Sequence, residues 1–226
     1  MSILRKYIRE VIEDEAPSIQ PESIIYCDMD GVLVDFAQGA ITLANTVISG
    51  DRYQGWVDQS KSMRRALRDI EAKQPGFEVK TSKDLDIPEV RTLMFAAIGF
   101  NPGEFFSQLP PLHDGLNTLW KYITSTSHSV SLLTAPVGSR KGVESMTAGE
   151  GKKMWANEWL RPSPGDVIIS PARQKPDYAI TNGIPNILID DKASTITSWN
   201  ERGGIGILHV TGNSERTIAE LRRLGI

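Results

Sequence analysis

The sequence predicts an α/β fold in which a parallel sheet carries helices on both faces and a small helical cap is inserted after the first strand. Two observations predict this arrangement. Short, continuous apolar runs alternate with helical segments along the chain, which is typical of strands that are buried on both faces. Between about residues 50 and 103 the segments are helical and no strong strand interrupts them, which indicates an insertion.

The apolar runs and the helical periodicity give the expected boundaries. We expect strands at 24–27, 130–134, 167–170, 186–190 and 205–210, and helices at 34–47, 63–73, 90–98, 114–124, 149–160 and 193–201, followed by a last helix that begins at Asn213 or Ser214. An amphipathic segment precedes the first strand. The expected division is therefore an accessory N-terminal helix at 1–17, a core domain at 18–40 and 104–226, and a cap at 41–103.

Composition restricts the class of protein. The 226 residues suit one domain with an insertion. The net charge of −3, from 25 basic and 28 acidic residues, disfavours a protein that binds long nucleic acids through general basicity, and it leaves small anionic substrates open. The single cysteine, Cys27, lies in the first strand, and no apolar run reaches about 20 residues. We therefore expect no disulfide, no membrane span and a cytoplasmic location.

The first strand delivers two carboxylates. Asp28 and Asp30 are separated by one residue, so in an extended strand both side chains point to the same side. Two unpaired carboxylates at the end of a buried strand are costly, and a divalent cation or a shared proton removes that cost. Gly31 follows at once and permits a sharp turn out of the strand.

Polar side chains follow other expected strands as well. Thr134 ends the second strand, where its hydroxyl can bond a phosphate oxygen. Asp190 and Asp191 follow a later strand; carboxylates at this density suit Mg²⁺, and the other interpretation is a pair that caps the next helix. Because ligands of parallel sheets bind at the carboxyl ends of the strands, we expect these residues to gather at one edge.

A buried cation is expected beside these acids. Lys152 lies three residues before Trp155 and seven before Trp159, so it shares a helical face that should pack against the sheet. A lysine directed inward needs an anionic partner. Arg140 and Lys141 are the alternatives for this role.

The run from Asp28 to Asp35 resembles the first motif of the haloacid dehalogenase superfamily of phosphohydrolases, Asp-x-Asp-Gly-x-x-x-Asp. The resemblance implies a haloacid-dehalogenase-like Rossmannoid sheet. It implies that Asp28 is the nucleophile that takes the phosphoryl group and that Asp30 is the general acid and base. It also implies that Thr134 and Lys152 are the second-motif hydroxyl and the third-motif lysine.

The same resemblance implies a Mg²⁺ site. In that superfamily the metal is held by the first aspartate side chain, the backbone carbonyl of the second aspartate, and a fourth-motif aspartate. The corresponding residues are Asp28, Asp30, and either Asp190, our first choice, or Asp191.

Further matches resemble one family of this superfamily, the 5′(3′)-deoxyribonucleotidases. Phe36 follows the first motif, Trp56 lies in an aromatic segment like one of their cap, and Arg173 with Lys175 resembles their Arg-x-Lys phosphate-binding pair. We interpret Phe36 and Trp56 as a wall for the base, since a base stacked on an aromatic ring gains about 1–3 kcal/mol.

These matches predict a magnesium-dependent phosphomonoesterase that dephosphorylates nucleoside monophosphates through an aspartyl-phosphate. Ala135 and Lys192 replace residues that are usually Ser and Arg in the nucleotidases, which affects substrate preference more than reaction type. The alternatives are a phosphatase for a sugar phosphate or a nucleic-acid 3′-end, and a non-catalytic binding protein of the same fold. Similarity also suggests a homodimer.

Overall fold

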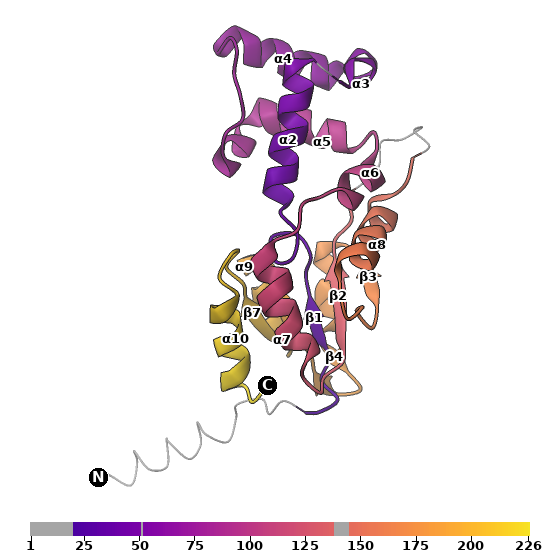
Figure 1. Cartoon of the computed structure of the whole chain (residues 1–226), viewed down its shortest axis with the longest axis vertical. Helices are drawn as coiled ribbons and strands as arrows, with labels where there is room; N and C mark the ends of the chain where they lie inside the picture. The colour runs from indigo at the N-terminus through magenta and orange to yellow at the C-terminus, as the bar shows by residue number, and fades with distance from the viewer. Residues whose placement is uncertain (1–19, 51, 138–144) are drawn as a thin grey trace, which may run out of the picture.

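The structure, a computed structural model, describes residues 20–50, 52–137 and 145–226. A parallel sheet of five strands forms one half of the molecule (Figure 1). The strands lie in the order β3–β2–β1–β6–β7, with the bounds Val167–Ile169, Val130–Thr134, Ile25–Cys27, Ile187–Asp190 and Ile205–Leu208. Every neighbouring pair is parallel. The predicted α/β fold with a parallel sheet is confirmed.

Helices cover both faces of the sheet because successive strand residues point to opposite sides. On one face, Tyr26, Leu133 and Leu188 pack in a cluster with Ile196 and Trp199 of α9 (Ala193–Glu201). The other face forms the larger core, with buried residues of α7 (Lys121–Thr124), α8 (Ala148–Trp159) and α10 (Ser214–Arg223). The central strands β1 and β6 are fully buried, which explains their largely apolar sequences, whereas the edge strand β3 is only partly buried.

The chain between β1 and β2 is helical in the part that the structure describes. Up to residue 107 its helices are α2 (Phe36–Ser49), α3 (Gln54–Gln59), α4 (Lys61–Lys73), the 3₁₀ helix η1 (Ser82–Asp86), α5 (Pro88–Ile98) and α6 (Pro102–Ser107). In Figure 1, α2 to α5 lie together beyond the carboxyl ends of the strands, and we call them the cap helices. Helix α2 spans residues 40 and 41, where we expected the boundary of the cap, so the division into domains stays a prediction.

The start of α2 shows how the sequence sets the cap on the sheet. Asp35 caps the helix, because its Oδ1 accepts a hydrogen bond from the backbone N–H of Gln38 at 2.9 Å. Ala40, Ala44 and Val47 then repeat at helical spacing and are buried. Gly50 ends the helix in the left-handed conformation.

Four features differ from the expectations. The predicted helix at 114–124 begins as a π-helix, η2 (Gly115–Trp120), before it continues as α7. The 3₁₀ helix η3 (Ala172–Tyr178) and a two-stranded antiparallel hairpin, β4 (Ile180–Thr181) and β5 (Ile184–Pro185), were not predicted. Trp159 is 41% exposed, although we placed it on the buried face of its helix, because α8 ends there.

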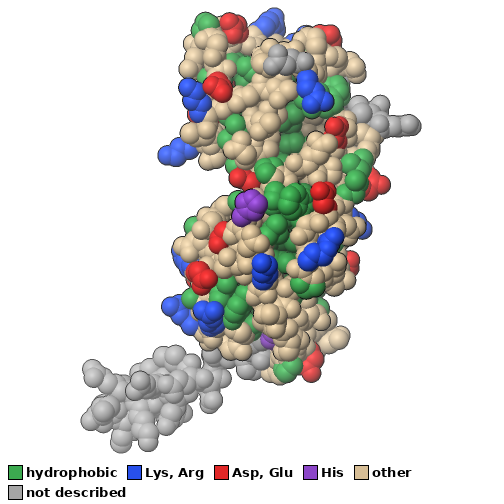
Figure 2. Space-filling view, in the orientation of Figure 1, with side chains coloured by type: hydrophobic (Ala, Val, Ile, Leu, Met, Phe, Trp, Pro, Cys, Tyr) green, Lys and Arg blue, Asp and Glu red, His purple; other side chains and the backbone are tan. Residues whose placement is uncertain are grey.

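Helix α6 connects the cap helices to the sheet and packs on α8 at a pair of glycines. A Cβ built on Gly151 would lie 2.1 Å from the carbonyl oxygen of Gly103, so the two backbones touch. The indole of Trp155 also donates a hydrogen bond to the carbonyl of Leu109, just after α6. Figure 2 shows hydrophobic side chains at the narrow waist between the cap helices and the sheet.

Within the described ranges, no helix has both the length and the apolar character that crossing a membrane requires. The predicted N-terminal helix, along with Arg140 and Lys141, lies outside the described residues.

Candidate active site

The predicted acidic residues lie together at the carboxyl edge of the central strands. Asp28 follows β1 and Asp190 ends β6, and the two strands are neighbours. Carboxylate oxygens of Asp28, Asp190 and Asp191 all lie within 4.8 Å of one another. Asp28 and Asp190 are 3% and 0% exposed, so these negative charges have little water to screen them.

The two neighbouring aspartates have different surroundings. Asp190 has both oxygens engaged, because Oδ2 accepts a hydrogen bond from Nζ of Lys175 at 2.7 Å and Oδ1 accepts one from the backbone N–H of Lys192 at 2.8 Å. Oδ1 of Asp191 is buried and accepts no hydrogen bond from any described residue, and the same holds for Oδ1 of Asp30. Unsatisfied buried carboxylate oxygens are costly, so a further ligand at these atoms is favoured.

The pKa values of the aspartates also indicate that this cluster favours a further positive ligand. Burial, together with the charges of Asp28 and Asp190, raises the pKa of Asp191 to about 6. Burial and the charge of Asp28 also raise the pKa of Asp190, against the effect of Lys175. The cluster therefore carries more negative charge than its single buried ammonium compensates.

Lys175 is the cation inside this cluster. Its Nζ lies 2.7 Å from Oδ2 of Asp190 and 3.1 Å from Oδ1 of Asp28, and the residue is 2% exposed. Burial lowers the pKa of Lys175, but the charges of Asp28 and Asp190 outweigh burial and raise it overall, so the ammonium stays charged. A bridging position like this fixes the Asp28 carboxylate.

Lys152 forms a second buried polar group beside the first. Its Nζ donates hydrogen bonds to Oδ2 of Asp30 at 2.6 Å and to Oγ1 of Thr134 at 2.7 Å. The ammonium also lies 4.6 Å from the centre of the Phe106 ring, within the range of a cation–π contact. Lys152 is completely buried, and it joins the residues at the ends of β1 and β2.

Gly31 sets the position of Asp191. Its φ of +79° is the left-handed conformation that glycine adopts without strain. A Cβ at this position would lie 2.4 Å from Oδ2 of Asp191. The turn is held by backbone hydrogen bonds, among them one from the Gly31 N–H to the Val34 carbonyl at 2.9 Å. The Asp28–Asp30–Gly31 motif therefore needs its glycine for space as well as for backbone conformation.

The remaining predicted site residues lie around this centre. Arg173 is exposed in η3, two residues before Lys175. Phe36 packs against Phe105 and Phe106 at ring distances of 5.8 and 6.2 Å. The structure thus brings Phe36 next to the ring that covers the Lys152 ammonium, whereas Arg173 has no described contact with the acidic cluster.

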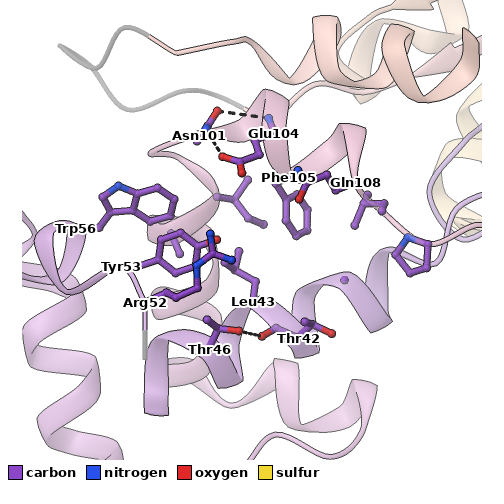
Figure 3. A pocket seen from close by; sticks show the side chains of 15 residues that line it. Thr42, Leu43, Thr46, Arg52, Tyr53, Trp56, Asn101, Glu104, Phe105 and Gln108 are labelled. Atoms are coloured by element: carbon purple, nitrogen blue, oxygen red, sulfur yellow. Dashed lines mark hydrogen bonds between the residues drawn. The ribbon is translucent and has the colours of Figure 1, made fainter. Parts of the chain in front are cut away.

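Trp56 occupies a cavity in the cap rather than the acidic edge. Its indole lies between Tyr53, at 4.0 Å, and Phe100, at 5.2 Å, with both rings nearly parallel to it. Two rings thus stack on Trp56 already, and its role as a wall for a base stays a prediction. The edge of the indole still borders the cavity (Figure 3).

This cavity has a volume of about 320 Å³ and lies between α2, α6 and the segment before α3. Sequence reasoning missed its polar residues, among them Arg52, Glu104 and Gln108. They come from three different segments without a common motif. The spacing of Asn101, Glu104 and Gln108 on one helical face was the only local signal.

The donor set fits a hard divalent cation. Three carboxylates meet within a few ångströms, and among the described residues three buried oxygens here, Oδ1 of Asp28, Asp30 and Asp191, have no hydrogen-bond partner. Oxygen ligands at this density are those that Mg²⁺ takes, with water completing its octahedron. No sulfur or imidazole group is part of the cluster that the described residues form.

No protein-family model matches the sequence, and no curated protein matches it. Among solved structures, a hydrolase from Streptococcus pneumoniae TIGR4 is 11% identical, with a TM-score of 0.47, covering 89% of this chain and 100% of that chain. The putative HAD-hydrolase YfnB from Bacillus subtilis, bound to magnesium, is 14% identical, with a TM-score of 0.45 and coverages of 84% and 87%. A HAD-superfamily hydrolase from Geobacter sulfurreducens PCA is 10% identical, with a TM-score of 0.46 and coverages of 85% and 89%. Similarity this low does not assign an activity.

Proposed function

We propose that this protein is a magnesium-dependent phosphomonoesterase of the haloacid dehalogenase type that acts on nucleoside monophosphates. One observation carries the proposal. Two buried lysines and the aspartates Asp28, Asp30 and Asp190 meet at the carboxyl edge of one parallel sheet. A binding scaffold has no need of two charged lysines in a buried position, because each is costly to desolvate.

The metal belongs beside Asp28 and Asp191. Asp191 is the better of the two fourth-motif candidates, because Asp190 already has both oxygens hydrogen-bonded. The side chains of Asp28 and Asp191 and the backbone carbonyl of Asp30 would hold the ion, and Asp190 would orient Lys175. When bound, Mg²⁺ neutralises phosphate charge and so lets an anionic nucleophile approach.

Asp28 is the nucleophile in this proposal. Its carboxylate, held by Lys175, attacks phosphorus as the bond from phosphorus to the leaving oxygen breaks, which gives an aspartyl-phosphate. Water then attacks the phosphoryl group, and Asp28 and inorganic phosphate are released. The buried ammonium of Lys175 keeps the nucleophile oriented through both steps.

Asp30 transfers the protons. It gives a proton to the leaving oxygen in the first step and takes one from the attacking water in the second. Lys152 holds the Asp30 carboxyl at 2.6 Å and the Thr134 hydroxyl at 2.7 Å, so it fixes both groups where phosphate oxygens approach. The Lys152 ammonium and the Thr134 hydroxyl stabilise charge that shifts onto those oxygens in the transition state.

A nucleotide substrate is supported by the aromatic groups above the site. Phe36 lies between the acidic edge and the cap, and the cap cavity is large enough for a nucleoside. The resemblance to 5′(3′)-deoxyribonucleotidases favours this substrate class over sugar phosphates. The cytoplasmic location and the homodimer stay predictions. The thiol of Cys27 is buried and forms no disulfide with the described residues.

Phosphate release from 5′- and 3′-nucleoside monophosphates and from sugar phosphates, with Mg²⁺ and with a chelator, tests the proposal. We expect selective, metal-dependent release from nucleotides, and a loss of about 10³-fold or more in Asp28→Asn. Asp86→Asn, an exposed aspartate of η1, is the matched control and should keep full activity. Substantial metal-dependent turnover by Asp28→Asn would contradict the mechanism, and release from sugar phosphates alone would contradict the nucleotide substrate.

A further inference from the structure

Two side chains of opposite charge, Arg52 and Glu104, line the cap cavity, and no other described residue forms an ion pair with either of them. Arg52 and Glu104 both line it, one from the segment before α3 and one from α6 (Figure 3). The guanidinium of Arg52 lies over the ring of Tyr53, 5.4 Å from the ring centre. Neither side chain forms an ion pair within the described parts of the chain. A charged pair of opposite signs facing one cavity suits a ligand that has donors on one edge and acceptors on another.

Glu104 is held in place by its own helix. The Asn101 side chain donates a hydrogen bond to Oε2 of Glu104, and Oδ1 of Asn101 accepts one from the Glu104 N–H at 3.4 Å. Figure 3 shows these two bonds beside the cavity. A carboxylate is a pure acceptor, so its free lone pairs select ligand groups that donate hydrogen bonds.

The cavity lies one aromatic layer away from the acidic edge. Phe105 lines the cavity and contacts Phe106 at 5.1 Å, and the Phe106 ring covers the Lys152 ammonium. That ammonium bonds Asp30. A continuous set of side-chain contacts, from Phe105 through Phe106 to Lys152, therefore connects the cavity to the acidic edge.

We propose that this cavity binds the base of a guanine nucleotide and that Glu104 and Arg52 are specificity-determining residues. The proposal rests on the phosphatase function proposed above. Guanine alone among the common bases offers two adjacent donors, the ring N–H and the 2-amino group, to the Glu104 carboxylate. Its O6 and N7 are the acceptors that arginine binds in pairs. Adenine and cytosine place a ring acceptor next to their amino group, and uracil has carbonyls on both sides of its N–H, so each repels a carboxylate.

The test is calorimetric titration of the Asp28→Asn protein with guanosine, inosine, adenosine and cytidine, which removes turnover and needs no phosphate. We expect guanosine to bind about tenfold or more tightly than inosine, which lacks the 2-amino group. Glu104→Gln in the same background should weaken guanosine binding most, weaken inosine binding less because inosine keeps the ring N–H, and leave adenosine and cytidine within about threefold. Glu158→Gln, an exposed glutamate of α8, is the matched control.

The outcomes separate the two proposals. Equal binding of guanosine and inosine, or guanosine affinity unchanged by Glu104→Gln, overturns the guanine site, even where nucleotides are dephosphorylated. An equal loss for all four nucleosides assigns Glu104 a structural role only and also overturns it. Guanosine binding that depends on Glu104, in a protein that releases no phosphate from any nucleotide, keeps the guanine site and rejects the phosphatase.

Discussion

The position of the Asp191 carboxylate requires a residue without a side chain at Gly31. The left-handed φ of +79° and the 2.4 Å approach of a built Cβ to Oδ2 of Asp191 together exclude other residues at this place. Gly50 offers a comparison, since its φ is +75° but no atom of the other described residues lies within 4 Å of a built Cβ. A substitution at Gly50 would therefore cause backbone strain alone, whereas the same substitution at Gly31 would also displace the Asp191 carboxylate.

We expect Gly31→Ala to weaken Mg²⁺ binding by about tenfold or more, since the new methyl group pushes Asp191 away from the other carboxylates. Gly50→Ala should cost the same backbone strain, about 1 kcal/mol, without changing Mg²⁺ affinity. Calorimetric titration with Mg²⁺ measures the affinity, and thermal unfolding measures the strain. An Mg²⁺ affinity for Gly31→Ala equal to that of Gly50→Ala would show that Asp191 does not hold the metal.

Individual site residues were predictable where they follow a strand directly. Asp28, Thr134 and Asp190 mark the ends of buried apolar runs, and parallel strands bring those ends together. The partners of the two lysines were not predictable in the same way. Lys152 and Lys175 come from a helix and a 3₁₀ turn, and only the packing of these elements decides which aspartate each faces.

Among the elements, the contact between α6 and α8 is the most restrictive. Gly151 and Gly103 let the two backbones touch, and any side chain at either place collides with main chain. Gly149, on the same helix, has a different environment, because a built Cβ there meets only the side chain of Ile169, at 3.3 Å.

We expect Gly151→Ala to lower the free energy of unfolding by about 1–3 kcal/mol, because the helices must move apart. It should also lower turnover, since Lys152 is the next residue of α8. Gly149→Ala gains helix propensity and has to displace only a flexible side chain, so we expect a change within about 1 kcal/mol. Denaturant unfolding of both variants checks this, and equal effects would contradict the close contact.

The prediction of helices and strands succeeded where the hydrophobic pattern was strong, and it failed where the elements were only a few residues long. The five strands of the sheet are apolar runs long enough to recognise. The hairpin of β4 and β5 has two residues in each strand, yet Asn182-Gly183 between them was a usable turn signal, since both adopt positive φ. The π-helical turns of η2 have no local sequence signature that we could use; in the fold, η2 packs against α10.

For the whole molecule, the acidic cluster makes the free energy of unfolding depend on pH and on metal binding. The pKa of Asp191 is about 6, above its ordinary value, so the protonated form is favoured by folding. Its stabilising contribution is complete at low pH and is lost as the pH rises through 6. Lys175, whose pKa is raised, stays charged throughout this range and does not offset the loss.

We therefore expect Mg²⁺ to raise Tm clearly at pH 7.5 and much less at pH 5, where protons compete for Asp191. Asp191→Asn should raise the Tm of the chelated protein at pH 7.5 and should remove most of the gain from Mg²⁺. Thermal unfolding at the two pH values, with Mg²⁺ and with a chelator, gives the comparison. A gain from Mg²⁺ that is the same at both pH values would contradict this coupling.

The glycine contact between α6 and α8 also determines where the molecule can bend. Because α6 is packed against α8 on the sheet side, a rotation of α2 to α5 relative to the sheet would have to bend the chain at the turn before Phe36 and at residues 99–101. Arg52 would travel with the rotating part and Glu104 would stay behind. Such an opening would move Arg52 away from Glu104. A ligand bound to both side chains would therefore stabilise the closed arrangement, and the rate of cap opening would limit the rate at which the ligand dissociates.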